Sequence, residues 1–479
     1  MHNLHLTTLP RYEFFYDVYP HTGQYTFHIR SMHEKYGPII RINPYELHID
    51  TPEFYETLYS SSKKRDKWTW FTRMFGLKGG VAFAADHNVH RIRRAALNPY
   101  FSQGKVRQLQ PVIEGNVQKW VGRLRGLEKS GEVVRCVVVA SAFSSDVIMS
   151  YSFGRSYKKL DKPDFDEDDY DATHVAASLA WVLKHFPFLL KLVKALPEFA
   201  QKSMGQALAT FVTLQAECKK QVQETMAEKD IKKEDLNHPT IFHELLNSKL
   251  PESEKGVLRL AEEAQTIIVA GQETIAWALT VVTYNLLTNP RVLKKLKEEL
   301  ETTISDINVS TPLAVLENLP YLSGVIKEGL RLSYGVVSRS QRIAFEPLAF
   351  SDGKKEWIIP PGTPVGMTSL LIHQNEAIYP NWREFRPERW IEDPRLDRYL
   401  VSFSKGSRGC IGMPLANAEM YLWLSGVFRR FGSPDIRFQG DEGVLELVDT
   451  GPEDVEVASD CFVPNIAAGR QGVRFRVLK

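Results

Sequence analysis

The ten residues "FSKGSRGCIG", at positions 403 to 412, hold three glycines, two cations and one of only four cysteines in the chain. Glycines let a backbone approach a bulky group closely, and the N–H groups of such a loop can stabilise a thiolate. The following "MPLANAEMYLWL" places Pro414 near a predicted helix start, so Cys410 stands just before a helix N-terminus, where negative charge is favoured. The stretch predicts an anionic Cys410; the alternative is an inert, buried cysteine.

The composition is that of one large globular unit. The 479 residues are 43% hydrophobic, and no linker-like segment divides them. The formal net charge of +2, from 60 basic and 58 acidic residues, gives no global field for nucleic acid. The four cysteines lie far apart without a CxxC pair, which disfavours a disulfide scaffold and a structural zinc site and favours a reducing compartment.

Apolar spacing predicts a mainly helical protein. Residues at helical spacing run from about 88 to 300. Alternating stretches at 38–50, 342–360 and 472–479 predict a minor sheet. The acidic run 161–171 is interpreted as a solvated loop, because charge runs rarely bury.

The segment 181–199 has two interpretations. Lys184, Lys191 and Lys194 stand among apolar residues, and Pro187 interrupts the helical pattern. The segment is either a pair of core helices whose lysines extend to solvent or an apolar lip that rests on a membrane and gates ligand entry. The first twenty residues contain neither a membrane span nor a signal peptide pattern.

Further motifs place polar groups at suggestive spacings. In "KEGLR", Glu328 and Arg331 lie three apart on one predicted helix face and can form an ion pair. Arg389 follows in the irregular "FRPERW". "AGQET", at 270 to 274, puts an acid and a hydroxyl inside an apolar helix, where they are costly unless satisfied.

The stretch "DHNVHRIRR" carries basic residues on a predicted helix. His87 and Arg91 are four apart and share a face. His87 and His90 could suggest a metal pair, but no third ligand follows at a recognisable spacing.

The opening stretch resembles the F-x-x-G-x-R-x-C-x-G haem signature of the cytochrome P450 family. The matching residues are Phe403, Gly406, Arg408, Cys410 and Gly412. The resemblance implies a mainly α, single-domain cytochrome P450 fold with a small β part. It also implies haem b whose iron has the Cys410 thiolate as axial ligand. The expected catalytic domain is 30–479, after a lead segment 1–29 from which a membrane anchor is absent or removed.

The other motifs resemble family motifs in the family's order. Glu328, Arg331 and Arg389 would form a buried structural network that braces the cysteine loop. Ala270 and Gly271 would leave room for O2, Thr274 would hold water there, and Glu273 would relay protons. The resemblance assigns His87 and Arg91 to a haem propionate, with His87 standing where tryptophan is common, and it adds Arg342 or Arg339, of which spacing favours Arg342.

The implied reaction is insertion of one oxygen atom from O2 into a hydrophobic small molecule. The resemblance to filamentous-fungal members suggests a secondary metabolite such as a terpenoid. Family position implies an apolar pocket lined by Phe71, Phe83, Ile267, Ala270, Val336, Val337 and Phe462. The alternatives are a haem-thiolate isomerase or peroxygenase that needs neither O2 nor a reductase, and a non-catalytic haem or lipid carrier.

The electrons for such a reaction must come from outside the chain, since it has no dinucleotide-binding glycine loop. The expected donor is NADPH–cytochrome P450 reductase, with cytochrome b5 as an optional second donor. Its docking patch would draw on Arg93, Arg94, Arg429 and Arg430. We expect a monomer with peripheral membrane contact, at the cytosolic face of the endoplasmic reticulum if an anchor is missing and cytoplasmic otherwise.

Overall fold

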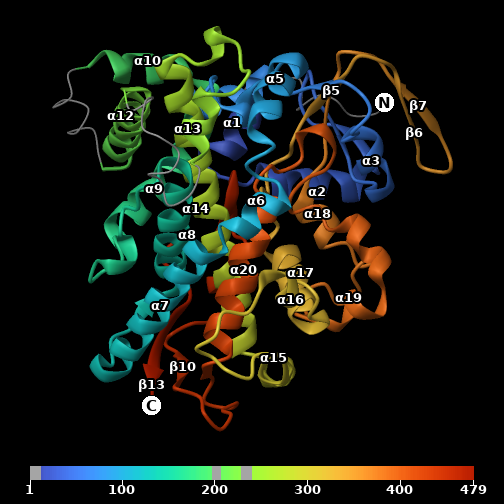
Figure 1. Cartoon of the computed structure of the whole chain (residues 1–479). Helices are drawn as coiled ribbons and strands as arrows, with labels where there is room; N and C mark the ends of the chain where they lie inside the picture. Colours follow the sequence, from blue (N-terminus) through green and yellow to red (C-terminus); the bar gives the residue numbers. More distant parts are fainter. Residues whose placement is uncertain (1–11, 197–205, 228–239) are drawn as a thin grey trace.

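The computed structural model describes residues 12–196, 206–227 and 240–479, which form a mainly helical body with small sheets (Figure 1). The longer helices of these residues are α2 (Tyr25–Tyr36), α5 (His87–Leu97), α7 (Gln110–Ser130), α8 (Cys136–Phe153), α9 (Glu167–His185), α10 (Phe188–Ala195), α12 (Gln206–Ala227), α14 (Val257–Leu287), α15 (Pro290–Thr303), α17 (Pro320–Ser333) and α20 (Met413–Phe428). The shorter ones are α1 (Tyr12–Asp17), α3 (Tyr55–Leu58), α4 (Thr69–Thr72), α6 (Gln103–Gln108), α13 (Ile241–Leu246), α16 (Leu313–Leu316), α18 (Ser369–His373) and α19 (Glu388–Glu392). The mainly α prediction is confirmed.

The core is built around α14, which runs through the middle of the molecule beside α8 and α20 (Figure 1). The α8 helix carries apolar residues on every face, and it is buried almost completely. By length and composition α8 and α14 could each cross a membrane, but both are buried core helices here.

The strands form one larger sheet, a four-stranded sheet and two hairpins. The five-stranded sheet has the order β1-β2-β8-β5-β3, with β1 (Ile39–Arg41), β2 (Leu47–Ile49), β3 (Arg65–Asp66), β5 (Arg342–Ala344) and β8 (Pro364–Gly366). The second sheet has the order β4-β13-β10-β9, with β4 (Val134–Arg135), β9 (Phe431–Gly432), β10 (Gly443–Leu447) and β13 (Arg474–Leu478). The hairpins are β6 (Leu348–Ser351) with β7 (Glu356–Ile359), and β11 (Ser459–Cys461) with β12 (Val463–Asn465). Strands therefore occur in all three stretches where alternation predicts them.

The sequence predicted that the acidic run 161–171 is a loop, but only its first part is one. Its second half is the first turn of α9, where Glu167, Asp168 and Asp169 stand at the positive end of the helix dipole. Arg135 of β4 also bonds Glu167 at 2.7 Å and Asp171 at 3.0 Å. A helix N-terminus and a neighbouring cation thus stabilise charges that the sequence pattern assigned to solvent.

The boundary expected after residue 29 has no structural counterpart. Tyr25 and Ile29 are buried in a cluster with Ile42. Within α1, the Glu13 carboxylate bonds the Lys184 ammonium of α9 at 2.5 Å. The described residues before 30 are therefore part of the packed body.

Pro187 separates α9 from α10, as the sequence predicted. Lys184, however, does not extend to solvent: its side chain is fully buried and is paired with Glu13 and Asp17. A buried ammonium needs such partners, because its desolvation is otherwise costly. Lys191 is exposed, and the side chain of Lys194 lies outside the described residues.

Candidate active site

Cys410 lies in a closed loop that leads into α20. The Cys410 N–H donates to the Phe403 carbonyl at 2.8 Å, and the Gly409 N–H donates to the Gly406 carbonyl at 3.0 Å. Cys136, Cys218 and Cys461 are buried, whereas the Cys410 side chain is exposed. The loop therefore presents one sulfur atom that other atoms can reach.

Only glycine fits at position 406. Its φ is +73°, and an added Cβ would lie 2.1 Å from the Tyr59 carbonyl oxygen. Gly412 is different: its φ is −78°, and an added Cβ would meet the Cys410 sulfur at 3.8 Å, an ordinary contact. The close approach at Gly406 docks the loop onto the chain that follows α3.

The electrostatics of Cys410 differ from the sequence expectation of a loop that makes the sulfur anionic by itself. Although the side chain has accessible surface, surrounding protein desolvates the sulfur and raises the pKa of the thiol. The N–H groups of Gly412 and Met413 and the charge of Arg94 lower that pKa only in part. A bound metal cation would complete the deprotonation, because coordinating thiols lose their proton.

The structure brings Glu328, Arg331 and Arg389 together in one buried network. Arg331 Nε and Arg389 Nε each lie 2.9 Å from a Glu328 carboxylate oxygen, and none of the three side chains is more than 4% exposed. Trp390 Nε1 adds a bond of 2.9 Å to the same carboxylate. These bonds to the Glu328 carboxylate all come from the chain itself, which is the arrangement that a structural network requires.

This network is linked to the cysteine loop through His373 of α18. Arg331 donates to the His373 carbonyl at 3.1 Å, and the Val401 N–H donates to His373 Nε2 at 3.0 Å. Ser402 Oγ donates to the Leu330 carbonyl of α17 at 2.7 Å. Residues 401 and 402, directly before Phe403, are therefore fixed to the helix that carries Glu328 and Arg331.

On α5, the residues nearest the cysteine loop are not His87 and Arg91, the pair that the resemblance assigns to a haem propionate. Arg91 is exposed, and His87 Nδ1 accepts the Arg65 N–H at 3.4 Å. Arg94, one turn further along, donates to the Gly409 carbonyl, and His90 is 5% exposed. Both pairs, 87 with 91 and 90 with 94, have the spacing of four that guided the prediction, so spacing alone could not distinguish them.

His90 and Arg94 belong to a cluster of basic groups, which we call the cationic cluster: Lys67, His90, Arg94, Arg342 and Arg408. The charges of Arg342, Arg408 and Arg94 add to burial in holding the pKa of Lys67 well below its ordinary value. Burial and the Arg408 and Lys67 charges lower the pKa of His90 to about 2. The side chains of this cluster thus share one region of the molecule.

Within the described residues, the cationic cluster forms no ion pair with a carboxylate. Lys67 donates to the Ala82 carbonyl at 2.6 Å, and Arg342 donates to the Ser340 hydroxyl at 2.8 Å. Arg408 donates to the carbonyls of Ala84, Arg65 and Ala85, and its Nε has no partner among the described residues. Uncompensated cations that are this buried are expensive, and the cluster is suited to an anionic ligand.

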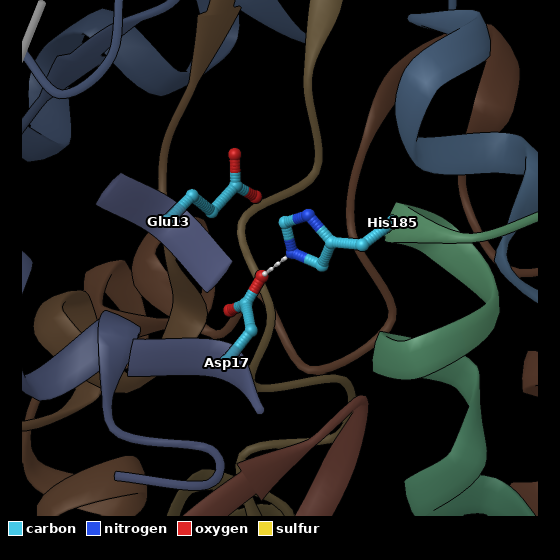
Figure 2. Close-up of side chains that lie close together, drawn as sticks. All are labelled: Glu13, Asp17 and His185. Atoms are coloured by element: carbon cyan, nitrogen blue, oxygen red, sulfur yellow. Dashed lines mark hydrogen bonds and ion pairs between the residues drawn. The ribbon is translucent and has the colours of Figure 1, made fainter. Parts of the chain in front are cut away.

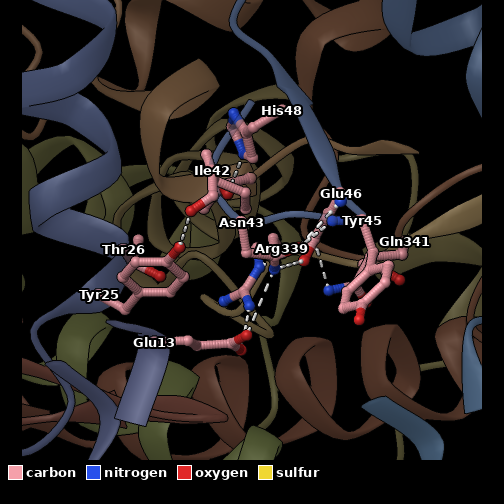
Figure 3. A network of polar contacts seen from close by, with 12 residues as sticks. Glu13, Tyr25, Thr26, Ile42, Asn43, Tyr45, Glu46, His48, Arg339 and Gln341 are labelled. Atoms are coloured by element: carbon pink, nitrogen blue, oxygen red, sulfur yellow. Dashed lines mark hydrogen bonds and ion pairs between the residues drawn. The ribbon is translucent and has the colours of Figure 1, made fainter. Parts of the chain in front are cut away.

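Arg339, the other arginine that the sequence left open, is already neutralised (Figure 3). Its guanidinium bonds Glu46 at 2.9 Å and also bonds Glu13, and it lies over the Tyr25 ring. Burial opposes ionisation of Glu13, but Arg339 and Lys184 lower the pKa of that carboxyl below its ordinary range. Because Arg339 is paired with carboxylates and Arg342 is not, Arg342 is the better candidate to bind an anionic ligand. Arg339 instead connects α1 to the residues before β2.

Glu13, Asp17 and His185 come close enough together to suggest a metal site (Figure 2). His185 Nε2 lies 3.0 Å from Asp17 Oδ2, and the Lys184 ammonium lies 2.5 Å from an oxygen of each carboxylate. The lysine thus provides the positive charge that these carboxylates need. This group is an ion-pair cluster that joins α1 to the end of α9.

The "AGQET" residues lie in the middle of α14. Thr274 Oγ1 donates to the Ala270 carbonyl at 2.8 Å, a bond that weakens the helix locally. Ala270 is exposed although most of α14 around it is buried, so this part of the helix borders accessible space. Gly271 instead faces α8, where an added Cβ would lie 3.1 Å from Ile148 Cγ1, so its small size serves helix packing.

Glu273 is 7% exposed, and its Oε2 lies 3.4 Å from His174 Nδ1 on α9. His174 Nε2 in turn lies 3.1 Å from Asn465 Oδ1. No sequence motif pointed to His174, which is 99 residues away from its partner.

The predicted pocket residues fall into separate groups. Phe71, Phe83 and Phe462 join Phe75 in what we call the aromatic cluster, with the Phe75 ring 5.2 Å from both Phe83 and Phe462 and Phe71 6.3 Å from Phe462. The Val337 N–H donates to the Phe462 carbonyl at 3.1 Å.

The aliphatic members of the predicted pocket lie elsewhere. The Val337 side chain packs against Tyr334 and Leu370, and Ile267 belongs to the main core. Val336, half-buried, accepts the Ser369 hydroxyl at its carbonyl, at 2.7 Å.

The four arginines expected to form a docking patch are engaged within the chain. Arg93 pairs with Glu254 at 2.7 Å, Arg94 contacts the cysteine loop, and Arg429 donates to the Ile304 carbonyl at 2.9 Å. Arg430 is only 5% exposed. The docking patch stays a prediction, with all four arginines buried or bonded within the chain.

A braced cysteine loop, a cationic cluster and a long helix with a central acid and hydroxyl are the features expected of a haem-thiolate protein. The cytochrome P450 family model matches residues 13–440. The chain belongs to the cytochrome P450 family, and it is an oxidoreductase of the monooxygenase type. The family implies a haem iron cofactor and the use of O2.

Similar proteins are fungal enzymes matched over nearly their whole length. The chain is 43% identical over 470 residues to cytochrome P450 monooxygenase tpcC of Cochliobolus heterostrophus, covering 97% of this chain and 89% of that protein. It is 41% identical to tryptophan 6-hydroxylase fscE of Fusarium equiseti, covering 97% and 89%. It is 38% identical to N-acetyltryptophan 6-hydroxylase ivoC of Emericella nidulans, covering 98% and 90%.

Proposed function

We propose that the Cys410 thiolate is the axial ligand of a haem iron and that the cationic cluster binds the haem propionates. The observation that carries this proposal is the cationic cluster itself, whose members have no carboxylate partner among the described residues, next to the one exposed cysteine. Carboxylates of a ligand would supply the missing charge, and Arg342, Arg408 and Arg94 can each donate to them. Cys410 and the cluster therefore fit the group that the family implies.

When bound, thiolate-ligated haem supplies the activation of O2 for insertion of one oxygen atom into a substrate. The chain's own residues would bind, orient and move protons. Thr274, at the accessible part of α14, would hold water there, and Glu273 would deliver protons. The Glu328 network would keep the cysteine loop in place through His373.

The substrate in this proposal is a hydrophobic small molecule, a fungal secondary metabolite such as a terpenoid. The aromatic cluster supports an apolar ligand. A second candidate is an indole or another aromatic compound, which Phe75 and Phe462 could stack against. It is favoured by the names of two relatives, a tryptophan and an N-acetyltryptophan 6-hydroxylase.

The electron source in this proposal is NADPH through a separate cytochrome P450 reductase, with cytochrome b5 as a further donor. The chain would act at the cytosolic face of the endoplasmic reticulum. The isomerase alternative predicts product without NADPH and reductase, and the peroxygenase alternative predicts it without them when hydrogen peroxide is supplied. The carrier alternative predicts ligand binding without any O2 consumption.

The Cys410→Ser variant tests the proposed ligand. We expect it to lose the red-shifted absorption band that the reduced carbon monoxide complex shows with a thiolate ligand, because a serine hydroxyl is not a soft anionic donor. Cys218→Ser, at a buried cysteine of α12, is the control and should keep the band. An unchanged band in Cys410→Ser would assign the ligand to another residue.

The substrate class is tested by spectral titration of the ferric protein with terpenoids and with tryptophan derivatives. A binding-induced shift of the haem band with one class selects between the two candidates. Turnover of the selected compound with and without NADPH and reductase then separates a monooxygenase from the isomerase, peroxygenase and carrier alternatives.

A further inference from the structure

Glu273 is too enclosed to exchange protons with solvent directly. Its side chain is 7% exposed, and its Oε1 has no hydrogen-bond partner among the described residues. Its Oε2 lies 3.4 Å from His174 Nδ1, a bond that joins α14 to α9. A carboxyl that hands on protons from this position needs a second titratable group, and His174 is the group in contact with it.

His174 joins Glu273 to the molecular surface. Its side chain is 26% exposed, and its ring stacks on Tyr170 at 5.8 Å. Its Nε2 lies 3.1 Å from Asn465 Oδ1 of β12. An imidazole that is in contact with both a buried carboxyl and solvent can carry protons between them.

The orientation of Asn465 determines which ring nitrogen of His174 carries a fixed proton. Asn465 Nδ2 donates to Ser459 Oγ at 3.3 Å and to Cys461 Sγ at 3.7 Å. Its Oδ1 is thereby turned to His174 and can only accept, so Nε2 must donate. Nδ1 and Glu273 Oε2 then share a single proton, either as an imidazolium–carboxylate pair or as a neutral imidazole with a carboxylic acid.

The surrounding charges favour the imidazolium. Burial lowers the pKa of His174, but the hydrogen bond and charge of Glu273, the Asn465 amide and the Asp171 charge together raise it above its ordinary value. Asp171 is itself paired with Arg135 of β4, whose guanidinium lies 5.7 Å from the Tyr170 ring centre. These groups, from α9, α14, β4 and β12, are the titratable and polar groups that face the imidazole.

We propose that His174 is a proton-relay residue that acts through Glu273 and connects solvent to the Thr274 region of α14. The Nδ1–H proton moves to Glu273 Oε2, which leaves His174 as the neutral Nε2–H tautomer. The protonated Glu273 carboxyl then turns away from His174 to deliver this proton toward Thr274, which frees Nδ1 to take up a proton from solvent before the carboxylate returns. Asn465 holds the imidazole ring in place throughout. This inference rests on the proposed function, since it names the source of the protons that Glu273 delivers.

The first test needs no turnover. In the reduced carbon monoxide complex of protein with 15N-labelled histidine, the resonance that His174→Gln removes should titrate above the ordinary histidine pKa. Glu273→Gln should lower that pKa, because the partner charge is gone. An unshifted titration in Glu273→Gln would overturn the contact on which the relay depends.

The second test follows NADPH oxidation with a fungal cytochrome P450 reductase and no added substrate. In His174→Gln, which keeps hydrogen-bonding capacity but cannot titrate, the rate should fall by about tenfold or more, and its pH dependence between neutral and mildly acidic pH should flatten. The matched control, His185→Gln, changes another histidine of α9 that contacts Asp17 and should retain the wild-type rate and profile.

The outcomes separate the relay from the proposed function. A wild-type rate and pH profile in His174→Gln, with an intact carbon monoxide spectrum, would overturn the relay and leave the haem-thiolate assignment standing. If the reduced carbon monoxide complex of the wild-type protein has no thiolate band, the proposed function is overturned. The histidine titration would still report on the His174–Glu273 contact. If His174→Gln does not fold, His174→Phe retains the ring that stacks on Tyr170 and takes its place.

Discussion

The arginines of α5 differ in what they contact, although they lie within two turns of one helix. Arg91 is exposed, whereas Arg94 donates to the Gly409 carbonyl, and its charge helps to lower the pKa values of Lys67 and His90. Burial lowers the pKa of Arg94, and the nearby Cys410 sulfur opposes that effect. The position of the side chain, more than its type, decides whether it can act on a bound anion.

The Arg94→Gln variant should therefore retain haem poorly. The loss of one charge-assisted hydrogen bond, worth about 1.5–3 kcal/mol, weakens retention by about tenfold or more. The haem-to-protein absorbance ratio after gel filtration measures this loss. Arg94→Lys should restore part of it, and Arg91→Gln should leave the ratio unchanged. A reduced ratio in Arg91→Gln but not in Arg94→Gln would restore the sequence-based assignment.

At the scale of elements, the cysteine loop depends on one glycine more than on the others. At Gly406 a side chain meets both a left-handed backbone and the Tyr59 carbonyl at 2.1 Å. At Gly412 a side chain meets neither. Replacing each glycine by alanine therefore tests whether the loop needs a special backbone conformation at Gly406 or small residues at both positions.

We expect Gly406→Ala to disrupt the loop and Gly412→Ala to preserve it. The left-handed conformation alone costs a residue with a Cβ about 1–2 kcal/mol, and the contact with Tyr59 adds to this cost. Haem content and the thermal unfolding midpoint of the two purified variants provide the measurement. Equal loss in both variants would show that the loop requires small residues at each position rather than a special backbone at one.

The elements that the sequence predicted are those whose signals are local. Glu328 and Arg331 are one helical turn apart, so their pairing follows from spacing alone. Cys410 and Gly406 belong to one short loop. The sequence also predicted the helix break at Pro187, because proline has no backbone N–H to donate and disrupts the interior of a helix.

The features that the sequence did not predict depend on contacts between distant parts of the chain. Lys67 has no motif, and its place in the cationic cluster follows from the packing of β3 beside β5. His174 meets Glu273 only because the fold brings one side chain of α9 against α14. The preference for Arg342 over Arg339 rests on Glu13 and Glu46, which bond Arg339 and lie about 300 residues earlier in the chain.

At the scale of the whole molecule, the chain's first described helix and the end of α9 are fixed to each other by buried charge. Lys184 bonds Glu13 and Asp17. Glu13 also bonds Arg339 (Figure 3). The α10 helix follows directly after this fixed point. Its orientation relative to the rest of the body is therefore determined at its N-terminal end.

That orientation exposes an apolar stripe on α10. Phe188 is 54% exposed and Leu192 58%, and their spacing of four places them on one face of α10. Leu196, 38% exposed, follows directly after the end of the helix. A stripe of this kind is favoured at a membrane surface and costly in water, so the second interpretation of the 181–199 segment gains support. The α10 helix lies at the edge of the molecule (Figure 1).

The Phe188→Glu/Leu192→Glu double variant should bind phosphatidylcholine vesicles more weakly than the unchanged chain, by about tenfold or more. Each apolar side chain contributes up to about 1.5–3 kcal/mol when it is removed from water, and the carboxylates replace that gain with a desolvation cost. Vesicle flotation of the purified holoprotein measures the bound fraction. Leu258→Glu, at a 68% exposed position at the start of α14, is the matched control. Equal flotation of the double variant and the wild-type chain would show that α10 does not contact the membrane, because vesicle binding would then not depend on Phe188 and Leu192.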